Sequence, residues 1–444
     1  MDTHSGRPTT DHPPPTDDQS STADRSVTRG PAPAGHGSCR SCRAPLTTTV
    51  VDLGEQPLAD HFPTAEELAA GPEPSWPLHV VVCTRCWLAQ LTHFDGADEI
   101  LDAHAHASSS YSETLLAHGA AWADGLVARL GLGPDSLVVE ASSNDGYLLA
   151  EFARRGVRVL GFDHHAANVE AARALGVETV PARLGPAQAA WLAARGGADL
   201  VLGNHNLANE RDLGAAGAAV RTALAPGGLA AFEFHHVLSM LDGAQFDVAS
   251  HSHCLYLSLL ALERALTANG LAVVDAERVD VHGGSVRAYA ARAEEGRQAG
   301  DRVAEVREVE RAAGLDTPAA YEGLGKRVDR IRADLLAYLE QARADGRRVA
   351  GYGAPAKGNT LLNACGVDAS LLPYTVDRAP GKHGRLLPGA RIPIRPPADL
   401  LDDRPDDVLI LPWSLADEIT RQMAAVRDWG GRFVVAVPRL EVLP

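Results

Sequence analysis

The stretch Ser136–Gly156, SLVVEASSNDGYLLAEFARRG, contains an apolar strand, a turn of small and polar residues, and an amphipathic helix. The same order recurs in VRVLGFDHHAANVEAARALG (157–176) and in ADLVLGNHNLANERDLGAAGAAVRTALAPGG (198–228), and the apolar strand LAAFEFHH follows at 229–236. Strands that alternate with amphipathic helices indicate a parallel sheet with helices on both faces. We therefore expect an α/β fold with a doubly wound central domain at 101–298.

Polar residues follow the ends of these strands, where a parallel sheet places its ligands. Glu140 ends the first strand, Gly146 closes its turn, and Asp163 ends the second strand, 23 residues after Glu140. Asp163 can accept hydrogen bonds from both hydroxyls of a ribose. Glu140 suits a ligand with a cationic end, such as S-adenosylmethionine, whereas a pyrophosphate favours a Gly-rich turn. The candidate cofactor-binding residues are Glu140, Ser142, Asn144, Asp145, Gly146, Asp163 and Asn204. The alternative is an ordinary strand–helix turn with a surface aspartate.

Four of the six cysteines form two CxxC pairs, Cys39 with Cys42 and Cys83 with Cys86. Four thiolates can complete a tetrahedral shell around Zn²⁺, and a complete shell has no open position for substrate, so the site is expected to be structural. We expect a zinc-ribbon-like module at 38–100. The alternative is four unrelated buried cysteines.

The remaining segments differ in composition. Residues 1–37 are rich in Pro, Ser, Thr, Asp and Gly and predict a disordered tail. Helical spacing of apolar residues predicts a connecting helix at 299–345, and a second α/β pattern predicts a Rossmann-like domain at 346–444. In its Gly-rich strand–helix turn, Lys357 is expected to meet a phosphate and Tyr352 to contact the substrate. The alternative is a tight turn needed only for packing.

The net charge is −16, and we find no long basic run, so nucleic acid is not an expected partner. No stretch approaches ~18 consecutive apolar residues, and the N-terminus lacks a signal-peptide pattern. We therefore expect a cytoplasmic protein that does not enter membranes.

Histidines gather after the third and fourth expected strands. They are candidates for proton transfer, because histidine titrates near neutral pH. A second metal ion is disfavoured, because the spacing of a HExxH motif is absent from the sequence. The alternative is a set of packed or surface side chains. The histidines are His205, His235, His236, His251 and His253.

Several motifs in this order resemble those of the sugar C-methyltransferases of deoxysugar biosynthesis. They are SSNDGYLL (142–149), APGG (225–228), HGGSVR (282–287), YGAPAKGNT (352–360) and LPGARIPI (387–394). The resemblance implies a zinc-binding domain, a central S-adenosylmethionine domain and a C-terminal Rossmann-like domain. It also implies methyl transfer to a carbon next to the ketone of a nucleotide-linked 4-keto-6-deoxysugar.

The sequence departs from that family at catalytic positions. The family motif F-D-x-x-Y-x-E-H is FDVASHSH here, so Ser250 and Ser252 replace Tyr and Glu while His253 is kept. Asn209 replaces a family histidine, and Tyr111 remains from a two-tyrosine motif. The resemblance implies roles for His253 and Tyr111, and His251, His236 and His205 are further candidates for proton transfer. Two alternatives stay open: a repurposed enzyme with another acceptor or a non-methylating reaction, and a non-catalytic binding partner.

Overall fold

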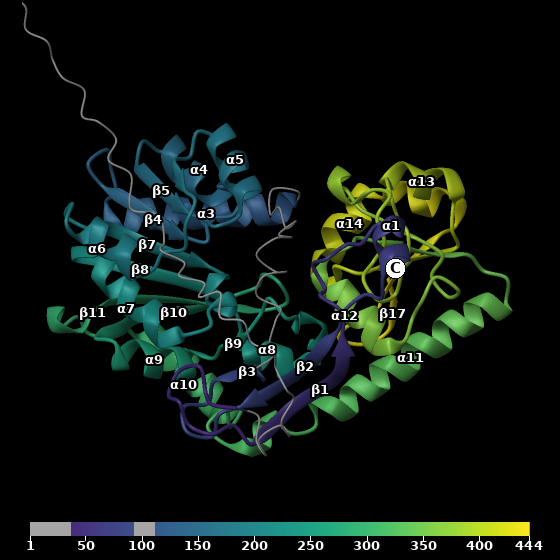
Figure 1. Cartoon of the computed structure of the whole chain (residues 1–444), viewed down its shortest axis with the longest axis horizontal. Coiled ribbons are helices and arrows are strands. Elements are labelled where there is room, and N and C mark those ends of the chain that lie inside the picture. Colours follow the sequence, from purple (N-terminus) through teal and green to yellow (C-terminus); the bar gives the residue numbers. More distant parts are fainter. Residues whose placement is uncertain (1–36, 93–111, 444) are drawn as a thin grey trace, which may run out of the picture.

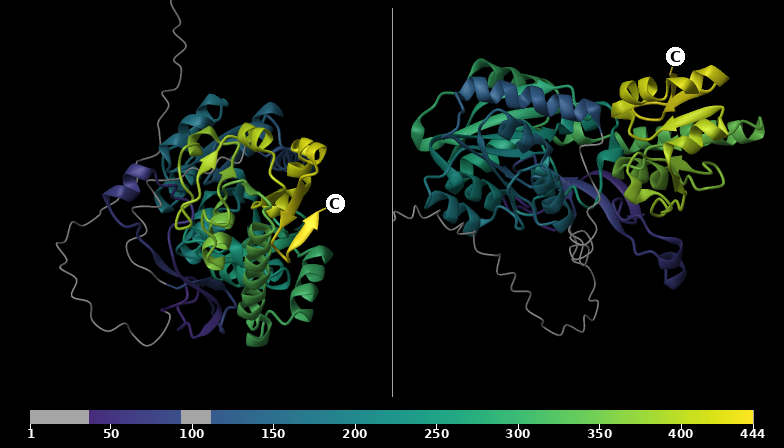
Figure 2. Two further views of the ribbon diagram at one scale, coloured as in Figure 1. Left: turned by 90° about the vertical axis from the view of Figure 1, so that its right-hand side faces the viewer. Right: turned by 90° about the horizontal axis from the view of Figure 1, so that it is seen from above.

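The computed structural model describes residues 37–92 and 112–443. Figure 1 shows two α/β bodies side by side, with the long strands of an N-terminal module running beneath them. The view from above in Figure 2 shows the same two bodies next to each other. The expected tail at 1–37 lies, apart from Gly37, outside the described residues. Of the helices that are described, none has the length and apolar character needed to cross a membrane.

The central domain contains a seven-stranded sheet in the order β10-β11-β8-β7-β4-β5-β6. Val138 packs on one face of this sheet and Val139 on the other, so the strand side chains alternate between two hydrophobic clusters. Helices cover both faces, which confirms the doubly wound class. The elements are α3 (Glu113–Leu130), β4 (Leu137–Ala141), α4 (Tyr147–Arg154), β5 (Arg158–Phe162), α5 (Ala166–Ala174), β6 (Thr179–Val180), α6 (Pro186–Ala193), β7 (Ala198–Asn204), η2 (Asn206–Asn209), α7 (Leu213–Ala223), β8 (Leu224–His235), α8 (Val237–Asp242), η3 (Phe246–Val248), β9 (Leu255–Tyr256), α9 (Leu259–Ala268), β10 (Leu271–Val279) and β11 (Ser285–Arg292).

One edge of this sheet is antiparallel, which corrects the expectation of a wholly parallel sheet. β11 pairs antiparallel with both β10 and β8. The connection between β10 and β11 is short and contains Gly283 and Gly284, whose φ angles are +92° and +115°. A connection this short can join only antiparallel neighbours.

The N-terminal module is an antiparallel sheet in the order β1-β2-β3-β9. Its fourth strand, β9, belongs to the chain of the central domain, where Leu255 pairs with Gln90. The module is therefore joined to the central domain through the backbone hydrogen bonds of one sheet. Its own elements are β1 (Thr48–Gln56), α1 (Ala65–Ala70), β2 (Trp76–Val82) and β3 (Ala89–Leu91).

The expected single helix at 299–345 is two helices, α10 (Asp301–Ala312) and α11 (Leu324–Ala344). Gly314, with a φ of +73°, and Pro318 lie between them, and both residue types interrupt helices. Val303 of α10 packs into the central domain, whereas Leu335 of α11 packs with the C-terminal domain. The break allows the two helices to cover different bodies.

The C-terminal domain has a six-stranded sheet in the order β14-β13-β12-β15-β16-β17. It is parallel except for the pair β16–β17, as expected for a Rossmann-like unit. One hydrophobic cluster contains Val80 of the N-terminal module together with Leu361 and Leu409 of this domain, so these two domains share a core. The elements are β12 (Val349–Tyr352), α12 (Ala356–Cys365), β13 (Thr375–Val376), β14 (Ile394–Arg395), α13 (Pro397–Asp403), β15 (Asp407–Ile410), η7 (Trp413–Leu415), α14 (Ala416–Gln422), β16 (Arg432–Val435) and β17 (Glu441–Leu443).

Candidate functional site

The turn between β4 and α4 has an unusual backbone. Ser142, Asn144 and Gly146 have φ angles of 54°, 53° and 79°. At Gly146 a Cβ atom would lie 2.8 Å from the Cβ atom of Ala172, so only glycine fits. The Ser143 N–H donates to the carbonyl of Phe162 at 3.0 Å, which holds the turn against the end of β5.

Carboxylates gather where these strands end. Asp163 accepts hydrogen bonds from the backbone N–H groups of Asn144 and His165, both at 2.9 Å. Glu140, Asp145 and Asp163 are all buried. Burial raises the pKa of Glu140 well above its usual range, and the nearby Asp145 and Asp163 raise it further. We call the seven predicted cofactor-binding residues on β4, β5, β7 and their turns the cofactor edge.

The chemistry of the cofactor edge suits S-adenosylmethionine. Oε2 of Glu140 is buried and has no hydrogen-bond partner among the residues that the structure describes. In Asn204, Nδ2 donates to the Tyr147 hydroxyl at 2.6 Å, while Oδ1 is a second buried acceptor that lacks a partner in the described ranges. Buried acceptors need donors, and a ligand with an ammonium group and ribose hydroxyls supplies them.

The four cysteines converge as the CxxC pairs predict. The Sγ atoms of Cys39 and Cys86 are 3.5 Å apart, as are those of Cys42 and Cys83, and all four lie within 4.8 Å of one another. Zn–S bonds of ~2.3 Å in a tetrahedron require sulfur separations of ~3.8 Å. Nε2 of Gln90 donates to Sγ of Cys39 at 3.3 Å, which stabilises a thiolate. The set therefore fits a structural zinc ion.

A charged network at the end of β8 was not predicted from the sequence. Glu233 is fully buried and accepts hydrogen bonds from Arg287 at 2.7 Å and from His118 at 2.8 Å, and His205 Nε2 lies 3.3 Å away. Burial opposes the charge of Glu233, but His118, His205 and Arg287 together hold its pKa well below its usual range. The available signal was a lone acidic residue in the apolar strand LAAFEFHH.

Histidines next to the cofactor edge form a group with one lysine. The rings of His205 and His282 meet edge to face at 4.4 Å, and both residues have a φ of 56°. His235 Nε2 donates to Oε1 of Gln245 at 2.7 Å, and Nε2 of Gln245 donates to the Gly283 carbonyl at 2.8 Å. We use the name histidine–lysine cluster for His205, His235, His253, His282 and Lys357, because the charges of His205 and Lys357 lower the pKa values of the other three.

Burial keeps two of these rings neutral. It lowers the pKa of His235 to about 3, and the positive charge of Lys357 acts in the same direction. Burial also lowers the pKa of His282 well below its usual range, and His205 and Lys357 lower it further.

The predicted catalytic residue His253 lies in this cluster. Its Nδ1 is 3.2 Å from the carbonyl of Val248, so Nδ1 carries the hydrogen that it donates. Burial lowers the pKa of His253, as do the charges of His205 and Lys357, whereas Asp60 raises it. The neutral ring therefore presents its lone pair at Nε2.

The two serines before His253 lead to a carboxylate of the N-terminal module. The Ser250 and Ser252 hydroxyl oxygens are 3.0 Å apart, and the Ser252 hydroxyl donates to Oδ2 of Asp60 at 2.9 Å. Asp60 lies in the turn after β1 and is half-buried.

Two other predicted catalytic histidines lie in packing positions. His251 is 1% exposed, and its Nε2 donates to the carbonyl of Trp76 in β2 at 3.2 Å. His236 is also 1% exposed and donates to Glu310 at 2.8 Å. The same Glu310 accepts hydrogen bonds from the N–H groups of Leu259 and Leu260 at the start of α9. Their catalytic role stays a prediction, which this geometry does not favour.

The two predicted substrate-binding residues, Tyr352 and Lys357, have different surroundings. Tyr352 is 5% exposed and packs in the core of the C-terminal domain. Lys357 places Nζ 4.7 Å from the centre of the Trp413 ring and 3.3 Å from the Ser414 hydroxyl. Trp413 in turn donates to Asp247 at 2.6 Å. Burial lowers the pKa of Lys357, and Asp247 opposes this shift.

Two further positions were identified from the family motifs, Asn209 and Tyr111. Asn209, which replaces a family histidine, is exposed at the end of η2. Tyr111 lies outside the described residues, so its predicted role is not tested.

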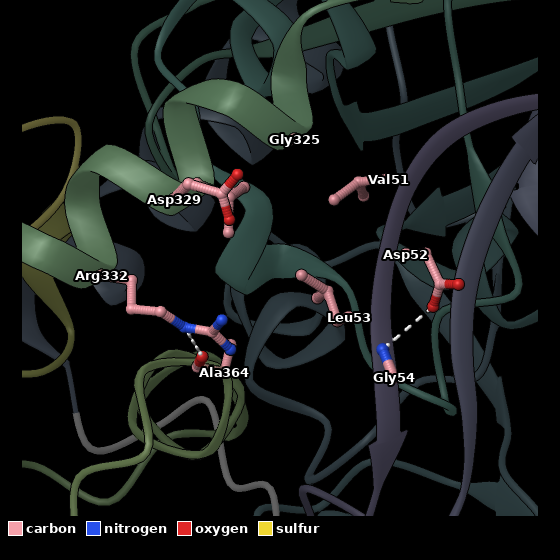
Figure 3. Close-up of a pocket in the computed structure, with 9 residues that line it drawn as sticks. Val51, Asp52, Leu53, Gly54, Gly325, Asp329, Arg332 and Ala364 are labelled. Carbon is pink, nitrogen blue, oxygen red and sulfur yellow. Dashed lines mark hydrogen bonds between the residues drawn. The ribbon is translucent and has the colours of Figure 1, made fainter.

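A cavity of about 460 Å³ lies elsewhere, between β1 and α11 (Figure 3). Asp52 lines it from β1, and Asp329 and Arg332 line it from α11. Nε of Arg332 donates to the carbonyl of Ala364 at 2.6 Å. None of the predicted site residues lines this cavity.

Three family profiles match successive parts of the chain. A zinc binding domain matches residues 39–100, a methyltransferase domain matches 116–276, and a C-methyltransferase C-terminal domain matches 280–438. Among curated proteins, the chain is 37% identical over 406 residues to C-methyltransferase NovU of Streptomyces niveus. That match covers 91% of this chain and 96% of the relative.

Two solved methyltransferase structures that resemble the chain are more distant from it. Geranyl diphosphate C-methyltransferase from Streptomyces coelicolor is 19% identical, with a TM-score of 0.33 over 42% of this chain and 87% of that chain. The 1,6-didemethyltoxoflavin-N1-methyltransferase of Burkholderia thailandensis is 18% identical, with a TM-score of 0.34 over 46% of this chain and 94% of that chain.

Proposed function

Because the chain belongs to the family of C-methyltransferases that combine zinc binding, methyltransferase and C-terminal domains, we propose that its acceptor is a nucleotide-linked keto-deoxysugar. The chain is an S-adenosylmethionine-dependent methyltransferase of this family with a structural zinc site. What is proposed is the acceptor, the methylated carbon, which is next to the ketone, and the residues that act on it.

The observation that carries the proposal is the state of His253. A carbon next to a ketone becomes a nucleophile only when a base removes its proton. A neutral imidazole that donates through Nδ1 to the Val248 carbonyl offers Nε2 as this base. His205 directly follows Asn204 of the cofactor edge, and its positive charge lowers the pKa of His253. We propose that the base and the bound cofactor face the same acceptor.

In the proposed reaction a C–H bond next to the ketone breaks and Nε2 of His253 takes the proton. The electron pair left behind as the enolate would form the new C–C bond to the methyl group that bound S-adenosylmethionine supplies, while the S–CH3 bond breaks and S-adenosylhomocysteine is the leaving group. The residues of the cofactor edge would hold S-adenosylmethionine beside the acceptor. This positioning by itself lowers the activation barrier, because the reacting atoms are already aligned.

Lys357 supports an anionic acceptor. With a net charge of −16, the protein needs local cations to bind a diphosphate. Lys357 places Nζ over the Trp413 ring and beside the Ser414 hydroxyl, and the Asp247 carboxylate opposes the lowering of its pKa by burial. We propose that it contacts a phosphate or the sugar oxygen that becomes negatively charged.

The substitutions Ser250, Ser252 and Asn209 favour a second candidate. Serine and asparagine do not replace tyrosine, glutamate and histidine in proton transfer. An enzyme with this fold that methylates an oxygen or nitrogen of a related acceptor would not need the tyrosine, glutamate and histidine to remove a proton from carbon. The non-catalytic alternative finds no support.

The test combines two measurements on the purified protein with thymidine-diphosphate-linked 4-keto-6-deoxyglucose. In deuterated water without S-adenosylmethionine, we expect deuterium to enter the carbon next to the ketone. With S-adenosylmethionine, we expect a product with one additional methyl group on that carbon, seen by mass spectrometry and NMR. Methylation of oxygen or nitrogen would establish the second candidate. Neither deuterium exchange nor methylation with any keto-deoxysugar of a panel would reject the acceptor class.

A further inference from the structure

We infer that Asp60 of the N-terminal module is a positioning residue for His253, acting through the serines that precede it. The inference rests on the proposed function of His253 as the base. It assigns a part in catalysis to a module whose family description mentions only zinc.

The contacts form a continuous path. Asp60 Oδ2 accepts the Ser252 hydroxyl hydrogen at 2.9 Å, and Ser252 precedes His253 directly. The Ser250 hydroxyl is 3.0 Å from that of Ser252. Both hydroxyls are neutral, so the charge in this path belongs to the carboxylate. Asp60 therefore fixes the segment that carries the base.

The loop that carries Asp60 is held on both sides by the C-terminal domain. Nδ2 of the fully buried Asn359 donates to the Ala59 carbonyl at 2.6 Å. Nη1 of Arg385 donates to the Phe62 carbonyl at 2.8 Å. A loop held at both ends can keep a side chain in one position, which is what a positioning residue requires.

The charged groups around His253 explain why a nearby carboxylate would stabilise its protonated form. Burial lowers the pKa of His253, and the facing groups His205 and Lys357 lower it too. Asp60 and the carbonyl of Val248 are the groups that raise it. When His253 takes a proton it becomes a buried cation, and a nearby carboxylate stabilises that cation.

The experiment uses the full-length, zinc-loaded enzyme in three variants. Asp60→Asn removes the charge and keeps the shape. The double variant Asp60→Asn/Ser252→Asp places the carboxylate at position 252, at the opposite end of the same hydrogen bond. Glu55→Gln removes an exposed charge from the same module and is the matched control. Zinc content and S-adenosylmethionine affinity are measured for each, to establish that all are folded.

The first readout needs no substrate. In histidine-labelled enzyme followed by NMR, Asp60→Asn should lower the pKa of His253, and the double variant should restore it. The second readout is turnover of thymidine-diphosphate-linked 4-keto-6-deoxyglucose, or of whichever keto-deoxysugar the wild type accepts. Asp60→Asn should lower kcat by about 10-fold or more with little change in KM, and the double variant should recover most of this loss.

An unchanged His253 titration in a folded Asp60→Asn variant would overturn the inference. So would a loss of turnover that the double variant fails to restore. If no keto-deoxysugar is turned over, the proposed acceptor fails, and the NMR titration alone still decides the role of Asp60.

Discussion

The cofactor edge and the histidine–lysine cluster lie next to each other but are assembled in different ways. The cofactor edge consists of strand ends of one sheet, joined by hydrogen bonds such as that from the Asn144 N–H to the Asp163 carboxylate. The cluster takes His205 from the end of β7, His253 from the segment before β9 and Lys357 from α12 of another domain. The first site therefore depends on one sheet, and the second on the packing of domains.

Loss of the zinc ion should produce the largest difference between the two sites, since we expect it to abolish methyl transfer and to leave cofactor affinity nearly unchanged. Cys83→Ser removes one of four ligands, and structural zinc contributes ~10 kcal/mol or more to the folding of small modules. We expect loss of zinc, a destabilised N-terminal module and loss of methyl transfer, because the Asp60 loop belongs to that module. S-adenosylmethionine affinity, measured by calorimetry, should change less than about threefold, since the cofactor edge uses none of its residues.

The control is Cys365→Ser, which alters a buried thiol of the C-terminal domain and should retain zinc. Full zinc content in Cys83→Ser, measured by mass spectrometry, would refute the four-cysteine site. A collapse of cofactor affinity would show that the two sites are not separable.

The next effect distinguishes two histidines that lie two residues apart. His253→Asn should lower methyl transfer and deuterium exchange by ~10²–10⁴-fold, the usual contribution of a general base. His251→Asn should change these rates only a few-fold, because His251 is occupied by the Trp76 carbonyl. Equal rate losses in both variants, with both folded by circular dichroism, would argue against the assignment of the base.

Within the cofactor edge, Asp163→Ala should weaken S-adenosylmethionine binding by about 1.5–3 kcal/mol, the usual worth of a hydrogen bond to a charged group. Part of this loss comes from the Asn144 and His165 N–H groups that the carboxylate also holds. Calorimetry measures the change, with the exposed Glu178→Gln as the control. An affinity equal to that of the wild type would exclude Asp163 from the ribose site.

The smallest effect concerns Glu233, which lies between the two sites. Its pKa in the folded protein is held below its ordinary value of 4.5. The charged form therefore contributes stability that is present above that ordinary pKa and is lost as the pH falls below it. The difference in free energy of unfolding between wild type and Glu233→Gln should be largest near pH 7 and should narrow below about pH 4. Urea unfolding at several pH values measures it, and a constant difference would contradict the prediction.

Local patterns predicted the parts of the molecule whose physics is local. The CxxC spacing placed both members of each thiol pair, and the alternation of strands with helices placed Glu140 and Asp163 at adjacent strand ends, where β4 and β5 pair in parallel. The break between α10 and α11 and the antiparallel edge of the central sheet were missed. The helix break depended on which body each helix packs against, and the antiparallel edge depended on the short connection between β10 and β11.

The histidines show the limit of the sequence most clearly. The family resemblance singled out His253, but the spacing of His205, His236 and His251 gave no reason to reject them as further candidates. Tertiary structure separates them, because Glu310 and the Trp76 carbonyl engage two of them in buried contacts while Val248 orients His253.

By itself, then, the sequence determined the fold class, the meeting of the four cysteines and the positions of Glu140 and Asp163 at adjacent strand ends, because each depends on residues joined by short spacings or by neighbouring strands. Only the tertiary structure decided what surrounds His253. Asp60 and Lys357 lie 193 and 104 positions away from it along the chain. Their charges reach it because hydrophobic burial between the domains, not any local pattern, brings those segments together.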